Sequence, residues 1–125
     1  MSCDEGELNE LTGEIIRCAF AVSNELGAGF LEKVYENALA HELRRARLAV
    51  EQQKGIQVLY DGVVVGEYAA DLVVNGRVIV ELKAVKAFDN VHFAQCLNYL
   101  KATGMEVCLL INFGVPKIEI KRFVN

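Results

Sequence analysis

The hydrophobic period of this 125-residue chain changes from helical to extended near its middle, and this change constrains the fold most. Over residues 8–26 the apolar side chains recur about every 3.6 residues, which predicts a helix ended by Gly27. A second helix is predicted over residues 30–47, with Leu31, Val34 and Tyr35 turned inward. From Ile56 onward the period becomes two, as in strands.

Two turn signals organise the extended half of the chain. Asp61-Gly62 and Asn75-Gly76 each predict a hairpin, and the strand that ends at Lys83 looks central because one of its faces is wholly apolar. The predicted strands cover residues 56–60, 63–65, 68–74, 77–83, 106–112 and 118–123. A third helix is expected over residues 90–103, with Gly104 as its end. The order predicts an α/β domain with an antiparallel meander, a crossover helix and C-terminal strands.

The length fits one domain, 1–125, in which residues 1–7 are expected to be mobile. No apolar run approaches the roughly 20 residues that span a bilayer, and the start lacks a basic signal region, so we expect a cytoplasmic protein without membrane contact. Hydrophobic residues make up 53% of the chain, which favours a homodimer. The net charge of -4 argues against binding nucleic acid by overall charge alone.

The cysteines show no Cys-x-x-Cys pair, which suits neither a zinc site nor a compact disulfide framework. We interpret Cys18, Cys96 and Cys108 as small buried residues and Cys3 as part of a mobile terminus. The cysteines are therefore not expected to carry the chemistry.

Glu81 and Lys83 end the most apolar strand and lie on one of its faces, because they are two residues apart. Charges there are costly to bury unless they are paired or used on a metal or substrate. An ordinary ion pair at the solvent edge is the alternative interpretation.

Asp71 lies in the preceding strand, and its position relative to Glu81 depends on the hairpin loop. A two-residue Asn75-Gly76 loop would place Asp71 and Glu81 on opposite faces of the sheet. An odd loop, such as one that pairs Val73 with Arg77, would place both carboxylates on one face, where they would suit Mg²⁺ or Mn²⁺. We therefore predict an odd register or a bulge in this hairpin.

Four motifs in this order resemble known proteins. Residues 29–35 match the pattern that names the GxxExxY family, and Asp71 followed by residues 81–83 resembles the signature of the PD-(D/E)XK nuclease superfamily. Residues 95–99 are similar to the helical QxxxY element of exonuclease-like members, and residues 111–114 to the ending of the GxxExxY family. The resemblance covers residues 11–113 and implies a restriction-endonuclease-like fold.

The resemblance implies a metal-dependent deoxyribonuclease that uses Mg²⁺ or Mn²⁺. Asp71, Glu81 and the backbone carbonyl of Leu82 would hold the ion, which would activate a water for attack on the phosphodiester. Lys83 would orient that water or stabilise the phosphorane, and Glu32 would supply a ligand directly or through water.

Further residues would support this site. Gly29 would let the second helix approach closely, and Tyr35 would be core. The residues expected to reach nucleic acid or the site are Gln95, Tyr99 and His92. A polar rim on a packed helix, with Tyr99 in the core, is the alternative for this last set.

Three functions remain open at this point. The first is a nuclease acting on DNA. The second is a catalytically silent nucleic-acid-binding or assembly module on the same fold. The third is an accessory subunit whose apolar surface docks a larger nuclease or helicase.

Overall fold

The computed structural model describes the backbone of residues 2–125 and the side chains of residues 5–125, so the expectation for Cys3 lies outside the described side chains. The three helices are α1 (Ser2–Leu26), α2 (Glu32–Arg45) and α3 (Asn90–Thr103). The strands are β1 (Val50–Tyr60), β2 (Val63–Val74), β3 (Val78–Lys83), β4 (Val107–Asn112) and β5 (Glu119–Val124). Helix α3 has the predicted bounds, and Gly104 ends it in a left-handed conformation with φ of 71°.

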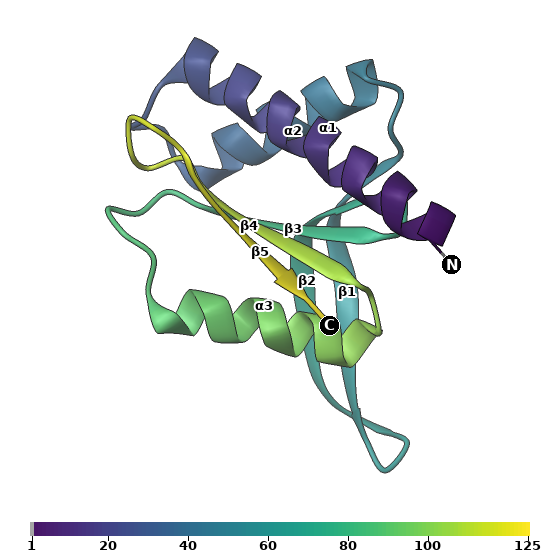
Figure 1. Ribbon diagram of the computed structural model, residues 1–125. Coiled ribbons are helices and arrows are strands. Elements are labelled where there is room, and N and C mark those ends of the chain that lie inside the picture. The colour runs from purple at the N-terminus through teal and green to yellow at the C-terminus, as the bar shows by residue number, and fades with distance from the viewer. Residues whose placement is uncertain (1) are drawn as a thin grey trace.

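The five strands form one mixed sheet in the order β1-β2-β3-β4-β5, so the predicted central strand lies in the middle (Figure 1). Strands β1, β2 and β3 form an antiparallel meander, and α3 provides the crossover to β4, which runs parallel to β3. Strand β5 then pairs antiparallel with β4. The predicted restriction-endonuclease-like architecture is confirmed.

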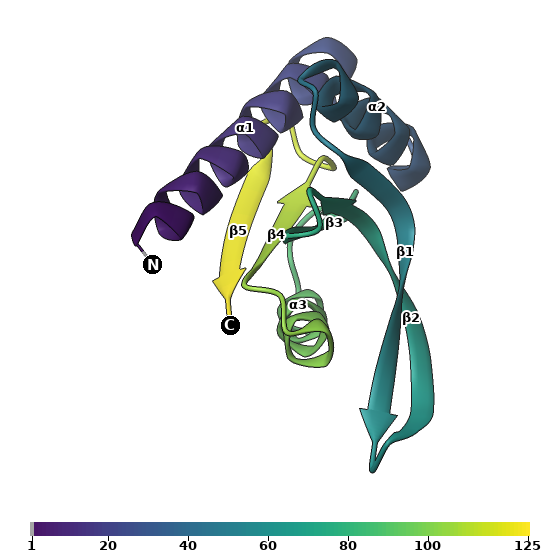
Figure 2. The same ribbon diagram turned by 90° about the vertical axis from the view of Figure 1, so that its right-hand side faces the viewer.

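Helices cover both faces of the sheet, as Figure 2 shows from the side. Helices α1 and α2 pack on the face that carries Val78, Val80 and Leu82, and α3 packs on the face of Ile79. Strand β4 is buried throughout, as expected for a strand between two helical layers. The end of β3, with its charged residues, therefore lies between two cores.

Helix α1 carries the predicted apolar stripe, and its residues Leu11, Ile15, Ala19 and Val22 are buried. The helix begins well before the predicted start at residue 8. Cys18 is buried in the same core, while Cys96 of α3 and Cys108 of β4 are buried in the core between α3 and the sheet, as predicted for all three.

Helix α2 begins later than predicted, and this changes which of its residues point inward. Leu31 is the N-cap, with extended backbone at φ of -72° and ψ of 154°, and it is 80% exposed. Val34 is exposed as well, so the predicted inward positions of Leu31 and Val34 are wrong. Leu31 precedes the helix, and the buried face runs through Tyr35, as predicted, and through Glu36 and Leu39.

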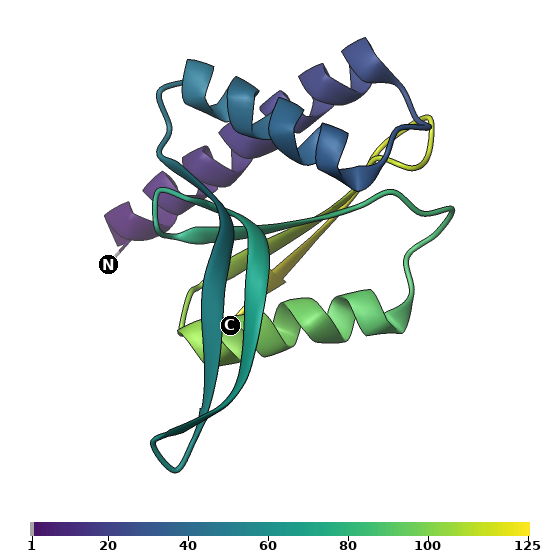
Figure 3. The same ribbon diagram turned by 180° about the vertical axis from the view of Figure 1, so that it is seen from behind.

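The β1–β2 hairpin is longer than predicted. Strand β1 already begins at Val50, although residues 51–55 are polar or glycine and have low strand propensity. Pairing with β2 over the whole length imposes the strand there, and β2 is continuous rather than split. The outer part of this hairpin, around the Asp61-Gly62 turn, projects beyond α3 (Figure 3).

Across the part of the chain that the structure describes, none of the helices combines the length and apolar character needed to cross a membrane.

Candidate functional site

The Asn75-Gly76 hairpin has the odd register that the convergence of carboxylates requires. Val74 pairs with Val78, and Asn75, Gly76 and Arg77 form the loop between them. The specific pair suggested from sequence, Val73 with Arg77, is wrong, but the parity of the loop is as predicted.

The physical reason lies in the neighbouring chain segment. The backbone nitrogen of Asn75 donates to the carbonyl of Ala49 over 2.8 Å, and Asn75 Oδ1 accepts from the Ala49 nitrogen over 2.8 Å. Asn75 is thereby held in line with β2, and the turn closes one residue later.

Asp71 and Glu81 consequently meet at the point where β2 separates from β3. The ladder between these strands ends at Leu72 and Val80, one step before the two acids. Beyond it, Glu81 Oε1 accepts from the Asp71 nitrogen over 3.0 Å, and Asp71 Oδ2 accepts from the Leu82 nitrogen over 2.8 Å. Here the backbone N–H groups donate to side-chain oxygens and not to the carbonyl oxygens of the neighbouring strand. The two carboxylates therefore lie together at the split, the point where β2 and β3 separate.

Glu81 is the more deeply buried acid, only 3% exposed. Burial, followed by the charge of Asp71, raises the pKa of Glu81 to about 8, although the hydrogen bond from Asp71 and the charge of Lys83 act in the opposite direction. A carboxylate in this environment lacks enough positive charge nearby to keep it ionised at neutral pH. A cation at this point would supply that charge.

Lys83 is half-buried, two residues after Glu81 on the same strand. Its carbonyl accepts from the Phe113 nitrogen over 2.8 Å, which fixes the strand end against β4. Its positive charge lowers the pKa of Glu81, against the larger effects of burial and of Asp71.

Helix α2 contributes a buried acid to this region, and it is Glu36 rather than Glu32. Glu32 is exposed at the first position of the helix, so the structure does not gather it with Asp71 and Glu81. Glu36 is only 4% exposed, and its Oε1 accepts from Gln53 Nε2 over 2.7 Å. The same Gln53 nitrogen lies 3.2 Å from Asp71 Oδ1, so one amide links the two carboxylates.

Gln53 adopts an unusual backbone conformation to make this link. Its φ is 52°, in the left-handed region that residues with a side chain rarely occupy. The β1–β2 pairing keeps one register before and after this residue, so Gln53 lies opposite Asp71. Strain of this kind persists where the surroundings require it. Sequence reasoning missed both Glu36 and Gln53; the position of Glu36 directly after the buried Tyr35 was the available signal for the first.

Helix α3 approaches the acid pair from the other side. Tyr99 is buried, and its hydroxyl accepts from Gln95 Nε2 over 3.0 Å. Burial, and then the charge of Glu81, raise the pKa of Tyr99 to about 12, so the phenol remains protonated. Gln95 and Tyr99 therefore share one helix face, as predicted, and Tyr99 occupies the core position of the alternative interpretation.

His92 has a local role at the start of this helix. Its Nδ1 accepts from the Asp89 nitrogen over 3.0 Å, as part of a capping box in which the Asp89 side chain accepts from the helix backbone. The imidazole thus caps the N-terminus of α3.

Two motifs that lie far apart in the sequence meet behind the site. The ring of Tyr35 stacks on Phe113 with centroids 4.7 Å apart and planes 7° apart, and its hydroxyl donates to the Gly27 carbonyl over 2.5 Å. At Gly29 φ is 117°, which explains the glycine, but an added Cβ would have no atom within 4 Å, so the predicted close approach there is wrong. The close approach is at Gly114, where a Cβ would lie 2.4 Å from the Val85 nitrogen.

The donor set at the split suits a hard divalent cation such as Mg²⁺. Mg²⁺ in proteins commonly takes one or two carboxylates and completes its shell with water and substrate phosphate. Among the described side chains, no cluster of three or more His, Cys, Asp or Glu residues capable of holding a metal is formed, so two carboxylates are what converge here. Asp71 and Glu81 fit this chemistry, and the raised pKa of Glu81 is the effect that a bound cation would reverse.

Comparison with known families gives one match that spans most of the chain. Residues 9–123 match the family model described as the PD-(D/E)XK nuclease superfamily. Neither the curated proteins nor the solved structures give a match.

Proposed function

Because the chain belongs to the PD-(D/E)XK nuclease superfamily, we propose that it is a nuclease that hydrolyses DNA phosphodiester bonds with the help of Mg²⁺ or Mn²⁺. The observation that carries the proposal is the meeting of Asp71 and Glu81 beside Lys83 at the split between β2 and β3. In the proposal, Asp71, Glu81 and the Leu82 carbonyl hold the ion. When bound, such an ion lends positive charge to the phosphate and makes water a better nucleophile.

The remaining roles follow from the contacts of the side chains. Lys83 is proposed to hold the attacking water or to neutralise charge that develops on the phosphate, because it is half-buried and follows Glu81 by two residues on the same strand. Glu36 and Gln53 are proposed to position Asp71 through their hydrogen-bonded chain. Glu32, exposed at the start of α2, is proposed to contribute only through water.

The finer resemblance to the GxxExxY family is supported by the contact between its two end motifs. Tyr35 belongs to the first motif and Phe113 to the last, and their rings stack directly. This stack holds α2 against the strand that follows the crossover, so both motifs serve the frame around the site.

The nuclease proposal is tested by incubating labelled linear, circular and branched DNA with the protein and Mg²⁺ or Mn²⁺. We expect cleavage by the wild type and at least about a hundredfold less with Glu81→Gln and with Lys83→Met, since each removes a charge at the reacting centre. Lys86→Met is the matched control, because Lys86 is exposed in the following loop and its loss changes the net charge equally.

The outcomes separate the possible functions. Equal cleavage by wild type and variants would point to a contaminating nuclease and would contradict the proposal. Binding of DNA without cleavage would favour the catalytically silent module. Absence of both would favour an accessory role beside a larger nuclease or helicase.

We also propose that the protein forms a homodimer through the outer part of the β1–β2 hairpin. Leu59, Tyr60, Val63 and Val65 are all exposed there. The accessible surface of the chain is 7340 Å², whereas a compact chain of this mass is expected to expose about 6,600 Å². That excess is close to the roughly 800 Å² per partner of a standard interface.

Analytical ultracentrifugation tests the dimer, with Val63→Lys as the disrupting variant and Val91→Lys, an equally exposed valine on α3, as the control. Only the first variant should lower the mass to that of one chain. A wild type that sediments as a single chain would exclude the dimer.

A further inference from the structure

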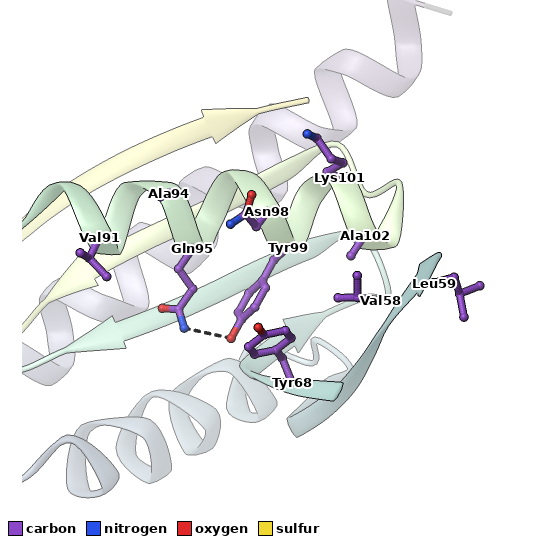
Figure 4. A pocket seen from close by; sticks show the side chains of 10 residues that line it. All are labelled: Val58, Leu59, Tyr68, Val91, Ala94, Gln95, Asn98, Tyr99, Lys101 and Ala102. Carbon is purple, nitrogen blue, oxygen red and sulfur yellow. Dashed lines mark hydrogen bonds between the residues drawn. The ribbon is translucent and has the colours of Figure 1, made fainter. Parts of the chain in front are cut away.

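A groove runs between α3 and the outer half of the β1–β2 hairpin (Figure 4). It has a volume of about 590 Å³ and includes Val58 and Tyr68 on one wall and Gln95, Asn98, Tyr99 and Lys101 on the other. Ligand pockets commonly measure about 300–1,000 Å³, so the space suits a nucleotide or two and not a duplex.

Two tyrosines stand together in this groove. The rings of Tyr68 and Tyr99 have centroids 5.9 Å apart and are tilted by 52°. Tyr99 is fixed by Gln95 in the core, whereas Tyr68 is 55% exposed and leaves a ring face open. An open aromatic face beside a fixed one is suited to stacking a nucleobase of any sequence.

The groove borders the sheet face that carries the candidate site. Tyr99 forms part of the groove wall and packs in one core with Ile79, which lies on the same face of β3 as Glu81. Burial, and then the charge of Glu81, raise the pKa of Tyr99. A strand lying in the groove would therefore be on the same face of the sheet as the two carboxylates.

The charge of the groove suits a polyanion although the chain as a whole is acidic. Lys101 is the charged residue among those that line it, at the rim, with its side chain directed away from the two tyrosine rings (Figure 4). No aspartate or glutamate whose side chain the structure describes lines the groove. The amides of Gln95 and Asn98 add hydrogen-bond donors. Apolar lining for bases and a cation for phosphate are the two requirements of a single-strand channel.

We propose that this groove binds unpaired single-stranded nucleic acid adjacent to the scissile phosphate, with a base stacked on the open ring face of Tyr68. The inference rests on the proposed nuclease function, since it assigns to that site a substrate with a single-stranded segment. Recognition by stacking would make the binding tolerant of sequence.

The test measures binding without cleavage, by fluorescence anisotropy of a labelled oligothymidine and of a duplex of equal length in EDTA. Tyr68→Ala should weaken binding of the single strand about five- to a hundredfold, the range for loss of one stacked base. Tyr68→Phe should bind as the wild type does, because it keeps the ring. The control is Phe20→Ala, which removes an exposed aromatic side chain from α1, outside the groove.

Several results would overturn the inference. They are failure of the wild type to bind the single strand, unchanged binding by Tyr68→Ala, equal weakening by Phe20→Ala, and an equal loss of duplex binding. A lower sedimentation mass for Tyr68→Ala would also overturn it, because a second copy of the chain would then cover the groove.

The two proposals fail separately. If Tyr68-dependent binding is found but Mg²⁺ and Mn²⁺ support no cleavage, the nuclease proposal fails and the groove stands. If the protein cleaves DNA and Tyr68→Ala binds normally, the groove assignment fails and the nuclease proposal stands.

Discussion

Glu81 accepts a hydrogen bond from the backbone nitrogen of Asp71 over 3.0 Å, at the point where the ladder between their strands has ended. Two acids are thereby held against each other, one of them buried, in a chain otherwise built from apolar layers. Gln53 and Glu36 extend this contact through hydrogen bonds, so substitutions at any of these residues should change stability or cleavage.

The metal-free protein should lose stability as the pH rises. The pKa of Glu81 is raised from 4.5 to about 8, so between these values the folded state binds more protons than the unfolded state. This contribution is fully present below pH 4.5 and is lost as the pH rises through about 8. In EDTA, the free energy of unfolding should fall by up to about 1.4 kcal/mol per pH unit in this window.

Glu81→Gln should abolish most of that slope, because an amide does not titrate. Urea denaturation at several pH values measures both proteins, and Glu42→Gln, at a half-buried acid of α2, is the control that should keep the slope. A wild-type stability that rises between pH 5 and 8 would contradict the assignment.

The two acids of α2 should differ in their effects. Glu36→Gln should cost about 1–3 kcal/mol of stability, because the buried carboxylate accepts from Lys33, Gln52 and Gln53 and the amide cannot accept all three. It should also lower Mg²⁺-dependent cleavage about 10- to 100-fold through the loss of the support for Asp71. Glu32→Gln should change stability by less than about 0.5 kcal/mol and reduce cleavage less. A larger loss of cleavage with Glu32→Gln would reinstate Glu32 as a direct ligand.

Substitutions at Gln53 should separate its backbone from its side chain. Gln53→Ala and Gln53→Gly both remove the amide that bridges Glu36 and Asp71, so both should reduce cleavage similarly. Only glycine accepts φ of 52° without strain, so Gln53→Gly should be more stable than Gln53→Ala by about 1 kcal/mol. Thermal and urea unfolding would show the difference, and equal stabilities would mean that the left-handed conformation carries no cost.

The stacked rings of Tyr35 and Phe113 should contribute mainly to the stability of the fold. Phe113→Ala should cost about 3–5 kcal/mol, as for other buried aromatic truncations. Tyr35→Phe keeps the stack and loses the hydrogen bond to the Gly27 carbonyl, which should cost about 1 kcal/mol. Phe20→Ala, at an exposed phenylalanine of α1, is the control, and a loss for Phe113→Ala no larger than the control's would contradict the role of the stack.

The sequence by itself determined the fold class and most of the elements, because hydrophobic period and turn residues act locally. The bounds of α3, the turn at Asp61-Gly62 and the central position of β3 could all be predicted in this way. The odd parity of the Asn75 loop was also predictable, once Asp71 and Glu81 were required to share a face.

Only the tertiary structure decided which side chains surround the acid pair. The polar start of β1 becomes a strand because β2 pairs with it, and Gln53 reaches Asp71 through a backbone conformation that its residue type does not signal. Glu32 and Glu36 lie one turn apart on the same side of α2, yet Glu36 is covered by its neighbours while Glu32, at the helix start, remains exposed, and no local pattern resolves this difference. Period and propensity are properties of neighbours in the chain, whereas a site depends on the register and rotation of elements that meet only after packing.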